Sequence, residues 1–375
     1  MRIVHLSDTH LGYSAYNKTE PTTGLNQRET DIYSAFNEII EYILKTKPDL
    51  VIHAGDLFDS VRPSNRAIHE AFRQFVRLSK AEIPTVIISG NHSTPRQKST
   101  GSIFRLLEFL EHVHPVFDGE YKTIEVGNAK IHAVPHPYNE EMFEENFKNL
   151  KADKNFNYNI LITHATVIGF NAYAGPEFKE LSIPPDVLSP NFDYIALGHL
   201  HRFIKVADNA FYSGSPERFS FNEAKDNKGF IDVELDNMNV KHVKTNAREM
   251  VDIEPIDCSK LDASQIMKSI ENSLPSDIAG KIIRLVFQDI PFHVHTSLDF
   301  RKIDELTSGA LHCEKQFMKK SAANNVVEST QIGSIGDEFS AFIKNHVTNE
   351  QQQTTLEKVG LRYLQKALQT TEEEE

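Results

Sequence analysis

The chain has 375 residues, of which 39% are hydrophobic and 25% charged, so it can form a sizeable core and is not mainly disordered. Its net charge of −13 is unlike that of a general nucleic-acid coat protein, so any DNA binding must depend on local basic patches. No run approaches the roughly 18 apolar residues of a membrane span, and two cysteines cannot form a disulfide framework, so we expect a cytoplasmic protein.

Short apolar runs alternate with amphipathic stretches through about the first 200 residues. Five of the runs are rich in β-branched residues and bounded by turn formers, as buried strands are; they are 3–6, 50–52, 85–88, 160–162 and 194–197. Apolar residues at helical spacing lie between them, over 32–44, 68–76 and 103–110. Strands that alternate with helices predict a layered α/β domain with much parallel pairing.

The pattern changes near Met250, where a second set of elements begins. Three strand-like and two helix-like segments predict a compact α/β unit; they are 251–253, 281–286, 311–318, 262–273 and 299–306. A polar linker over 324–336 and two short amphipathic helices follow. We therefore divide the chain into residues 1–248, 249–323 and 324–375.

Side chains that can bind a metal follow each of the five strands predicted in the first part of the chain. In chain order they are Asp8 and His10, Asp56, Asn91 and His92, His164, and His199 and His201. Because sites in layered α/β folds lie at the carboxyl ends of the strands, five segments would direct their ligands to one place. A lone histidine at a strand end is more often structural, whereas five such segments in order predict a metal site.

Carboxylates, an amide and imidazoles together suit Mn²⁺, Fe²⁺ or Zn²⁺, and they differ from the cysteines that structural zinc prefers. The set also holds more ligands than one ion needs. A carboxylate such as Asp56 can bridge two ions about 3.5–4 Å apart, which is the spacing used in phosphoester hydrolysis. Such a pair lowers the pKa of a bound water molecule and neutralises charge on the phosphate.

The ordered motifs Asp8-x-His10, Gly55-Asp56, Gly90-Asn91-His92, His164 and Gly198-His199-Leu200-His201 resemble those of the calcineurin-like metallophosphoesterases. Segment 213–219 (SGSPERF) and Lys228-Gly229-Phe230 also resemble the nuclease subunit of the double-strand-break repair nuclease/ATPase complex, the SbcD-type exonuclease family. The resemblance covers roughly residues 1–235 and is weak beyond them. It implies a layered β-sandwich flanked by helices, a small α/β cap domain that contacts DNA, and C-terminal helices.

The resemblance also implies roles for individual residues. One ion would be held by Asp8, His10 and His201 and the other by Asn91, His164 and His199, with Asp56 bridging them. Two Mn²⁺ ions are expected, with Mg²⁺, Fe²⁺ or Zn²⁺ as alternatives. His92 would contact the scissile phosphate and assist the leaving group.

Two positions depart from the pattern of the family. Many members have aspartate where this chain has Ser93, which affects the orientation of the loop more than metal binding. Some members have histidine where this chain has Asp59. Asp59 then either orients His10 or His92, or caps a local turn. We interpret His293 and His295 as a surface pair in preference to a third metal site.

A locally basic segment follows the second predicted strand. Arg62, Arg66, Arg96 and Lys98 follow strand ends and are candidates for contacts with DNA phosphates, which give affinity without sequence preference. We expect Arg73 and Arg77 to lie on a solvated helix face.

The resemblance implies a 3′–5′ exonuclease on duplex DNA that is also an endonuclease on single strands and hairpins. It further implies docking of residues 330–375 on a coiled-coil, SMC-like ABC-type ATPase, a homodimer, and association with a prokaryotic nucleoid. A hydrophobic patch on the helix after Pro63 or on the helix after Thr100 is a candidate for the dimer interface. One alternative is a metallophosphoesterase for another substrate, such as a cyclic nucleotide or a phosphoprotein. A scaffold that has lost its chemistry is the other, although the full ligand set argues against it.

Overall fold

The computed structural model describes residues 1–95, 97–168, 181–183, 188 and 191–319, together with the isolated positions 343, 356, 359 and 360. Residues 1–319 form one compact unit and 320–375 a second. The predicted helices within 330–375 lie outside the described residues apart from those isolated positions. None of the helices in the described ranges combines the length and apolar character needed to cross a bilayer.

Six strands form the first sheet, in the order β14-β13-β1-β2-β3-β4. Their bounds are Arg2–Leu6 (β1), Leu50–His53 (β2), Thr85–Ile88 (β3), Val113–Val116 (β4), Gly229–Glu234 (β13) and Asn239–Lys244 (β14). Strands β1 to β4 are parallel, while β13 pairs antiparallel with β1. The carboxyl ends of the first three predicted strands therefore lie along one edge of this sheet.

A second six-stranded sheet has the order β11-β12-β10-β7-β6-β5. Its strands are Lys122–Val126 (β5), Ala129–Val134 (β6), Tyr158–His164 (β7), Tyr194–Gly198 (β10), Ile204–Ala207 (β11) and Ala210–Tyr212 (β12). Strand β7 pairs parallel with both β6 and β10, so the last two predicted strands also end side by side. The short strands β8 (Thr166–Val167) and β9 (Ser182–Ile183) form a separate pair.

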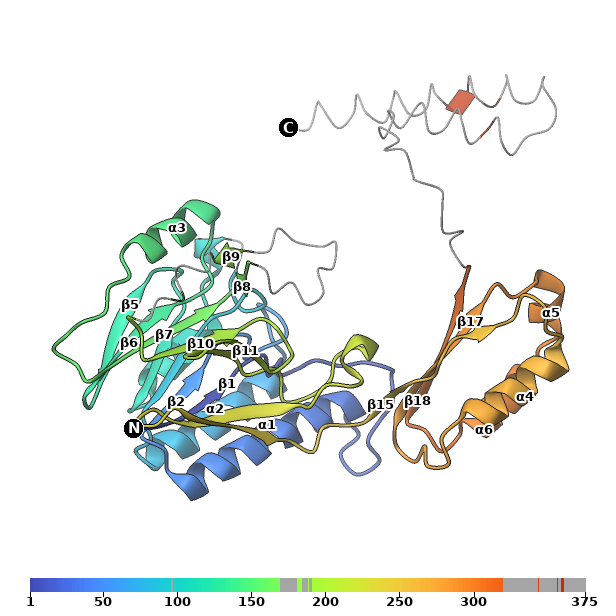
Figure 1. Cartoon of the computed structure of the whole chain (residues 1–375), viewed down its shortest axis with the longest axis horizontal. Helices are drawn as coiled ribbons and strands as arrows, with labels where there is room; N and C mark the ends of the chain where they lie inside the picture. Colours follow the sequence, from blue (N-terminus) through green and yellow to red (C-terminus); the bar gives the residue numbers. More distant parts are fainter. Residues whose placement is uncertain are drawn as a thin grey trace. The chain divides into compact units, whose positions relative to one another are not determined.

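The two sheets pack face to face, with helices outside them (Figure 1). Alternation along the strands explains the layers: Ile3 and Ile52 belong to the core between the sheets, whereas Val4 and Val51 pack against the helices. That outer layer contains the helices α1 (Gln27–Thr46) and α2 (Asn65–Lys80) and the 3₁₀ segment η2 (Ile103–Phe109). Helix α3 (Glu140–Lys148) contributes Phe143 to the outer face of the second sheet.

Residues 250–318 form a third, four-stranded sheet with its own core. Its elements are β15 (Met250–Asp252), β16 (Ile256–Asp257), α4 (Ala263–Ser273), β17 (Ile282–Gln288), α5 (Phe292–Ser297), α6 (Phe300–Leu306) and β18 (His312–Met318). The three helices gather on one side of β17 and β18 (Figure 1). Asp262 and Gln265 form a capping box that begins α4.

Two local predictions differ from the structure. The amphipathic segment 103–110 folds as 3₁₀ helix, in which the N–H of Leu110 donates to the carbonyl of Leu107, because apolar residues three apart fit both helix types. His293 and His295, which the alternation of residues in the sequence predicts to lie on a strand or turn, lie in the short helix α5. The other 3₁₀ segments in the described ranges are η1 (Lys98–Thr100) and η4 (Phe221–Glu223).

Candidate metal centre

Five strand ends bring the predicted ligands together. Asp8 and His10 follow β1, Asp56 follows β2, Asn91 and His92 follow β3, His164 ends β7, and His199 and His201 follow β10. Three of these strands belong to the first sheet and two to the second. The predicted ligands therefore meet where the carboxyl ends of strands from both sheets lie close together.

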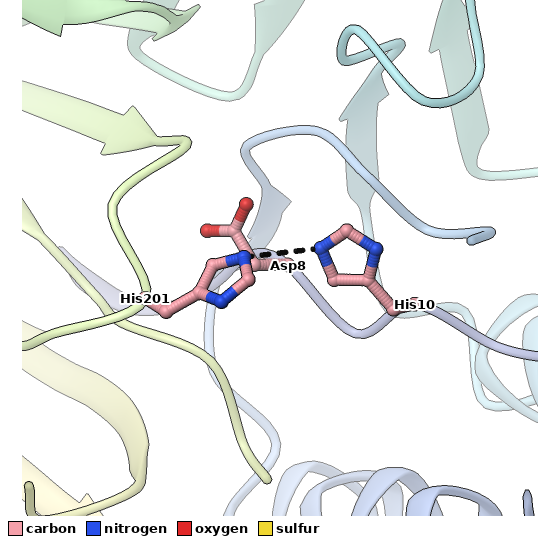
Figure 2. Close-up of side chains that lie close together, drawn as sticks. All are labelled: Asp8, His10 and His201. Carbon is pink, nitrogen blue, oxygen red and sulfur yellow. Dashed lines mark hydrogen bonds between the residues drawn. The ribbon is translucent and has the colours of Figure 1, made fainter. Parts of the chain in front are cut away.

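One cluster consists of Asp8, His10 and His201, whose ligand atoms lie within 4.8 Å of one another (Figure 2). Nε2 of His10 is 3.2 Å from Nε2 of His201, and the carboxylate of Asp8 lies beside both rings (Figure 2). Asp8 and His10 are buried, and the backbone N–H of His199 donates to both oxygens of Asp8 at 3.1 Å. The three side chains thus present one oxygen and two nitrogens to a common point.

A second cluster surrounds His164 and shares Asp8 with the first. It contains Asp8, Asp56 and His164, again with ligand atoms within 4.8 Å. Nε2 of His164 lies 3.0 Å from Oδ2 of Asp56 and 3.0 Å from Oδ1 of Asn91. The amide oxygen of Asn91 is also 3.3 Å from Nδ1 of His199. Asp56 therefore lies beside His164, and Asp8 is common to the two clusters.

The hydrogen bonds of His164 test whether this site suits a cation. Its Nδ1 donates to the carbonyl of Ala54 at 2.8 Å, so a neutral ring has a bare Nε2 that faces the oxygens of Asp56 and Asn91. Three unprotonated acceptors repel one another unless a positive charge lies among them. The donor set therefore fits a divalent cation.

The pKa values of His164, Asp56 and Asp8 also indicate that the site favours a positive charge. Burial lowers the pKa of His164, but the carboxylates of Asp56 and Asp8 outweigh it and raise the pKa to about 9. Burial raises the pKa of Asp56, yet His164 lowers it far below its ordinary value. The pKa of Asp8 is lowered too, because the attraction of His164 and His201 exceeds the effect of burial. Both carboxylates are thus held ionised although they are buried.

The backbone of the ligand loops is strained. Four of the predicted ligands have a positive backbone φ, which residues other than glycine rarely adopt. They are Asp8 (53°), His10 (44°), Asp56 (51°) and His199 (101°). Strain of this kind is worth about 1–3 kcal/mol per residue and gathers at functional sites. Its presence at four ligand positions points to a role in function.

Glycines before the ligands leave room for close contact. A Cβ at Gly55 would lie 2.2 Å from Nδ1 of His164, and one at Gly90 would lie 2.3 Å from Oδ1 of Asp56. A Cβ at Gly198 would lie 1.9 Å from the carbonyl oxygen of Ala54. The Gly-Asp, Gly-Asn-His and Gly-His motifs therefore combine a predicted ligand with the space that its neighbours need.

His92 lies at the exposed side of the site. Its backbone N–H donates to Oδ1 of Asp56 at 3.0 Å, and its Nδ1 donates to the backbone carbonyl of Asp59 at 2.9 Å. The carboxylate of Asp59 lies 3.3 Å from Nδ1 of His10, but the two groups are not oriented for a hydrogen bond. Ser93 is buried, and its Oγ has no hydrogen-bond partner among the described residues.

A pocket of about 610 Å³ adjoins these side chains. It extends from Asn91, His92, His164 and His199 to His136 and Tyr138 on the segment before α3. Sequence reasoning did not identify the last two residues, because no recognised motif contains them.

The predicted DNA contacts are less uniform than the ligands. Arg62 is exposed and follows Val61, which lines the pocket. Arg66 is exposed on α2, with Nη1 3.8 Å from the carboxylate of Glu29. Arg96 and the side chain of Lys98 lie outside the described part of the chain.

One contact of the centre was not anticipated. Glu223, in η4, accepts a hydrogen bond from Nδ1 of His201 at 3.1 Å and pairs with the buried ammonium of Lys228. Lys228 belongs to a motif that the sequence analysis singled out without a role, whereas Glu223 carried no local signal.

Comparisons with known proteins show which family this chain resembles. Residues 1–203 match the family model described as calcineurin-like phosphoesterase. The "DNA double-strand break repair protein Mre11" of Methanocaldococcus jannaschii is 33% identical over 303 residues, which cover 76% of this chain and 77% of that protein. The Mre11 of Methanococcus maripaludis is 34% identical, covering 61% and 60% of the two chains. A crystal structure of a Thermus thermophilus protein aligns with TM-score 0.41 and 12% identity over 64% of this chain and 96% of that one.

Proposed function

The chain belongs to the calcineurin-like phosphoesterases and, among them, to the family of the DNA double-strand break repair protein Mre11, and on this basis we propose that it is a metal-dependent DNA nuclease. The observation that carries the proposal is the convergence of carboxylate, amide and imidazole donors from five strand ends. The family implies a dinuclear site for divalent metal ions, and the donors described above fit it.

We assign Asp8, His10 and His201 to one ion, Asn91, His164 and His199 to the other, and Asp56 to both. Because these donors suit several divalent cations, we propose Mn²⁺ as the working metal and keep Mg²⁺, Fe²⁺ and Zn²⁺ as outcomes of a metal screen. When bound, the ions would neutralise charge on the phosphate and lower the pKa of a water molecule.

His92 is assigned to the substrate and not to a metal. Its Nδ1 is engaged by the carbonyl of Asp59, which leaves Nε2 as the ring atom that can reach a phosphodiester. A protonated ring in this position can donate to the departing oxygen. Asp59 would act through its carbonyl on His92 and through its carboxylate on His10.

The substrate is proposed to be DNA, cut 3′–5′ from duplex ends and internally in single strands and hairpins. Phosphate contacts from the exposed segment after β2 would bind the strand without reading its sequence. An Arg62→Ala variant should weaken binding equally for unrelated sequences and reduce the salt dependence by about one ion. A sequence-dependent loss would contradict this assignment.

The proposal is tested by Mn²⁺-dependent cleavage of end-labelled duplex and hairpin DNA, with a small phosphodiester in parallel. We expect the wild type to cut DNA, and a His92→Ser variant to lose cleavage while it still binds metal. His69→Ser is the matched control, because His69 lies exposed on α2 away from the ligands. Turnover of the small ester alone would keep the metal site and reject the nuclease.

Three further assignments concern organisation and partners. We propose that residues 1–248 form the nuclease domain, 249–323 a cap that contacts DNA, and 324–375 a linker and helices that dock on a coiled-coil ABC-type ATPase. The separate core of the third sheet supports the cap.

We also propose a homodimer, supported by the exposed side chains of Leu106 and Phe109 in η2. A cytoplasmic, nucleoid-associated location would follow from the DNA substrate, and imaging of a tagged chain tests it.

A further inference from the structure

The ring of His201 is fixed by a carboxylate on its outer side. Its Nδ1 lies 3.1 Å from Oε1 of Glu223, and since a carboxylate only accepts, Nδ1 carries the proton. A neutral His201 therefore has its lone pair on Nε2, which is the atom that faces His10 at 3.2 Å. Glu223 thus selects the tautomer in which His201 can bind an ion between the two rings.

Glu223 is in turn held by Lys228. The side chain of Lys228 is fully buried, and its ammonium donates to Oε2 of Glu223, to Oγ of Ser215 at 3.0 Å and to the carbonyl of His201 at 2.8 Å. All three donors of the ammonium are used. A buried cation with a complete set of partners anchors Glu223, and it also fixes the backbone of His201.

The same network does not support the other histidines of the centre. His164 is held by the carbonyl of Ala54, and Nδ1 of His10 has no hydrogen-bond partner among the described residues. Only at His201, within the part of the chain described, do a carboxylate and a lysine act together on one ligand. Ser215 reinforces the arrangement, since its backbone N–H donates to the His201 carbonyl at 3.1 Å.

We infer that Glu223 and Lys228 are positioning residues that orient His201 toward the metal and make it a stronger ligand. A histidine that donates to a carboxylate is more basic, and loss of such a partner weakens metal affinity about 10–100-fold. The inference rests on the proposed metal role of His201. It also gives a role to Ser215 and Lys228, which belong to motifs that resemble the family but contribute no ligand.

Equilibrium binding of Mn²⁺, followed by the electron paramagnetic resonance signal of the free ion, tests the inference without an activity assay. We expect two ions in the wild type. In a Glu223→Gln variant, which keeps the size of the side chain, one ion should bind about 10–100-fold more weakly and the other normally. Asp226→Asn is the matched control, because Asp226 is buried in the same loop and pairs with Arg202 without contacting His201.

Two further variants separate positioning from folding. Lys228→Met should weaken the same ion and lower the melting temperature, because it leaves Glu223 buried without its cation. The double variant E223Q/K228M should regain part of that stability and none of the affinity. If Glu223→Gln does not fold, Glu223→Asp takes its place, since it keeps the charge but withdraws it from Nδ1 of His201.

The outcomes distinguish this inference from the proposed function. Normal binding of both ions by a folded Glu223→Gln or Glu223→Asp protein would overturn it while the metal centre stands. Recovery of affinity in the double variant would also overturn it. A wild type that binds no Mn²⁺ would remove the premise together with the proposed metal centre.

Discussion

A single methyl group at Gly90 should disable the metal centre. In a Gly90→Ala variant the new Cβ would lie 2.3 Å from Oδ1 and 2.6 Å from Cγ of Asp56. Ordinary contact begins at 3.4 Å, so the carboxylate must retreat by the difference between 3.4 and 2.3 Å, about 1.1 Å. The backbone N of Asp56 is only 2.7 Å away, which prevents relief by a simple side-chain rotation. Because misplacement by about 1 Å can reduce a rate about 100-fold, we expect at least that loss of DNA cleavage.

The assay is Mn²⁺-dependent cleavage of labelled duplex DNA, with metal binding measured on the same samples. Gly309→Ala is the control, because the nearest atom to its new Cβ would be Cγ1 of Ile278, at an ordinary contact distance of 3.5 Å. Crowding of this kind also destabilises a protein by about 1–3 kcal/mol, so urea unfolding must show that the variant is folded during the assay. A folded Gly90→Ala protein with wild-type cleavage and two bound ions would refute the reasoning.

Four other results are expected. Asp31→Asn should lower the free energy of unfolding in urea by about 2–3 kcal/mol, because Asp31 accepts two 2.6 Å hydrogen bonds from Arg248; an unchanged midpoint would contradict this. Burial raises the pKa of Asp232, but the hydrogen bonds that it accepts outweigh burial and lower the pKa below the unfolded value of about 4. The stabilisation by Asp232 is therefore complete above that pH and is lost in acid, so the stability deficit of Asp232→Asn should shrink as the pH falls below about 4. Deletion of residues 330–375 should abolish association with the ATPase and spare cleavage, and co-purification after the deletion would reject the docking assignment. Phe109→Glu should give a monomer in sedimentation at concentrations where the wild type is a dimer, and a persisting dimer would place the interface elsewhere.

The strands that precede the predicted ligands could be predicted because they are central and pair in parallel. Such strands are buried on both faces and read as continuous apolar runs, and all five predicted runs lie within observed strands. Edge strands gave a weaker signal. The segment Lys122–Val126, β5, mixes charged and apolar residues, because it is half-exposed and pairs with only one neighbour. Its absence from the prediction follows from this exposure.

The sequence predicts the order of the candidate ligands along the chain, but it does not predict the residues that hydrogen-bond to them. His164 could be proposed as a ligand from its place after a strand, but its hydrogen bond to Ala54 spans 110 residues. Buried histidines near the ligands show the limit of reasoning from residue type. His53 ends β2 next to the metal loop, yet its ring shares a hydrogen bond with Thr9 in the core, and burial lowers its pKa to about 3.

Spatial proximity of glycine and ligand explains why the motifs were informative at all. A motif such as Gly90-Asn91-His92 contains a predicted ligand and the space beside it, so the local sequence reflects a tertiary contact between Gly90 and Asp56. Glu223 has no such signature, because its partner His201 needs only an acceptor of the right length and places no constraint on neighbouring residues. Residues that need a glycine beside them therefore leave a local motif in the sequence. Residues that only supply a hydrogen bond leave no such motif and have to be found from the fold.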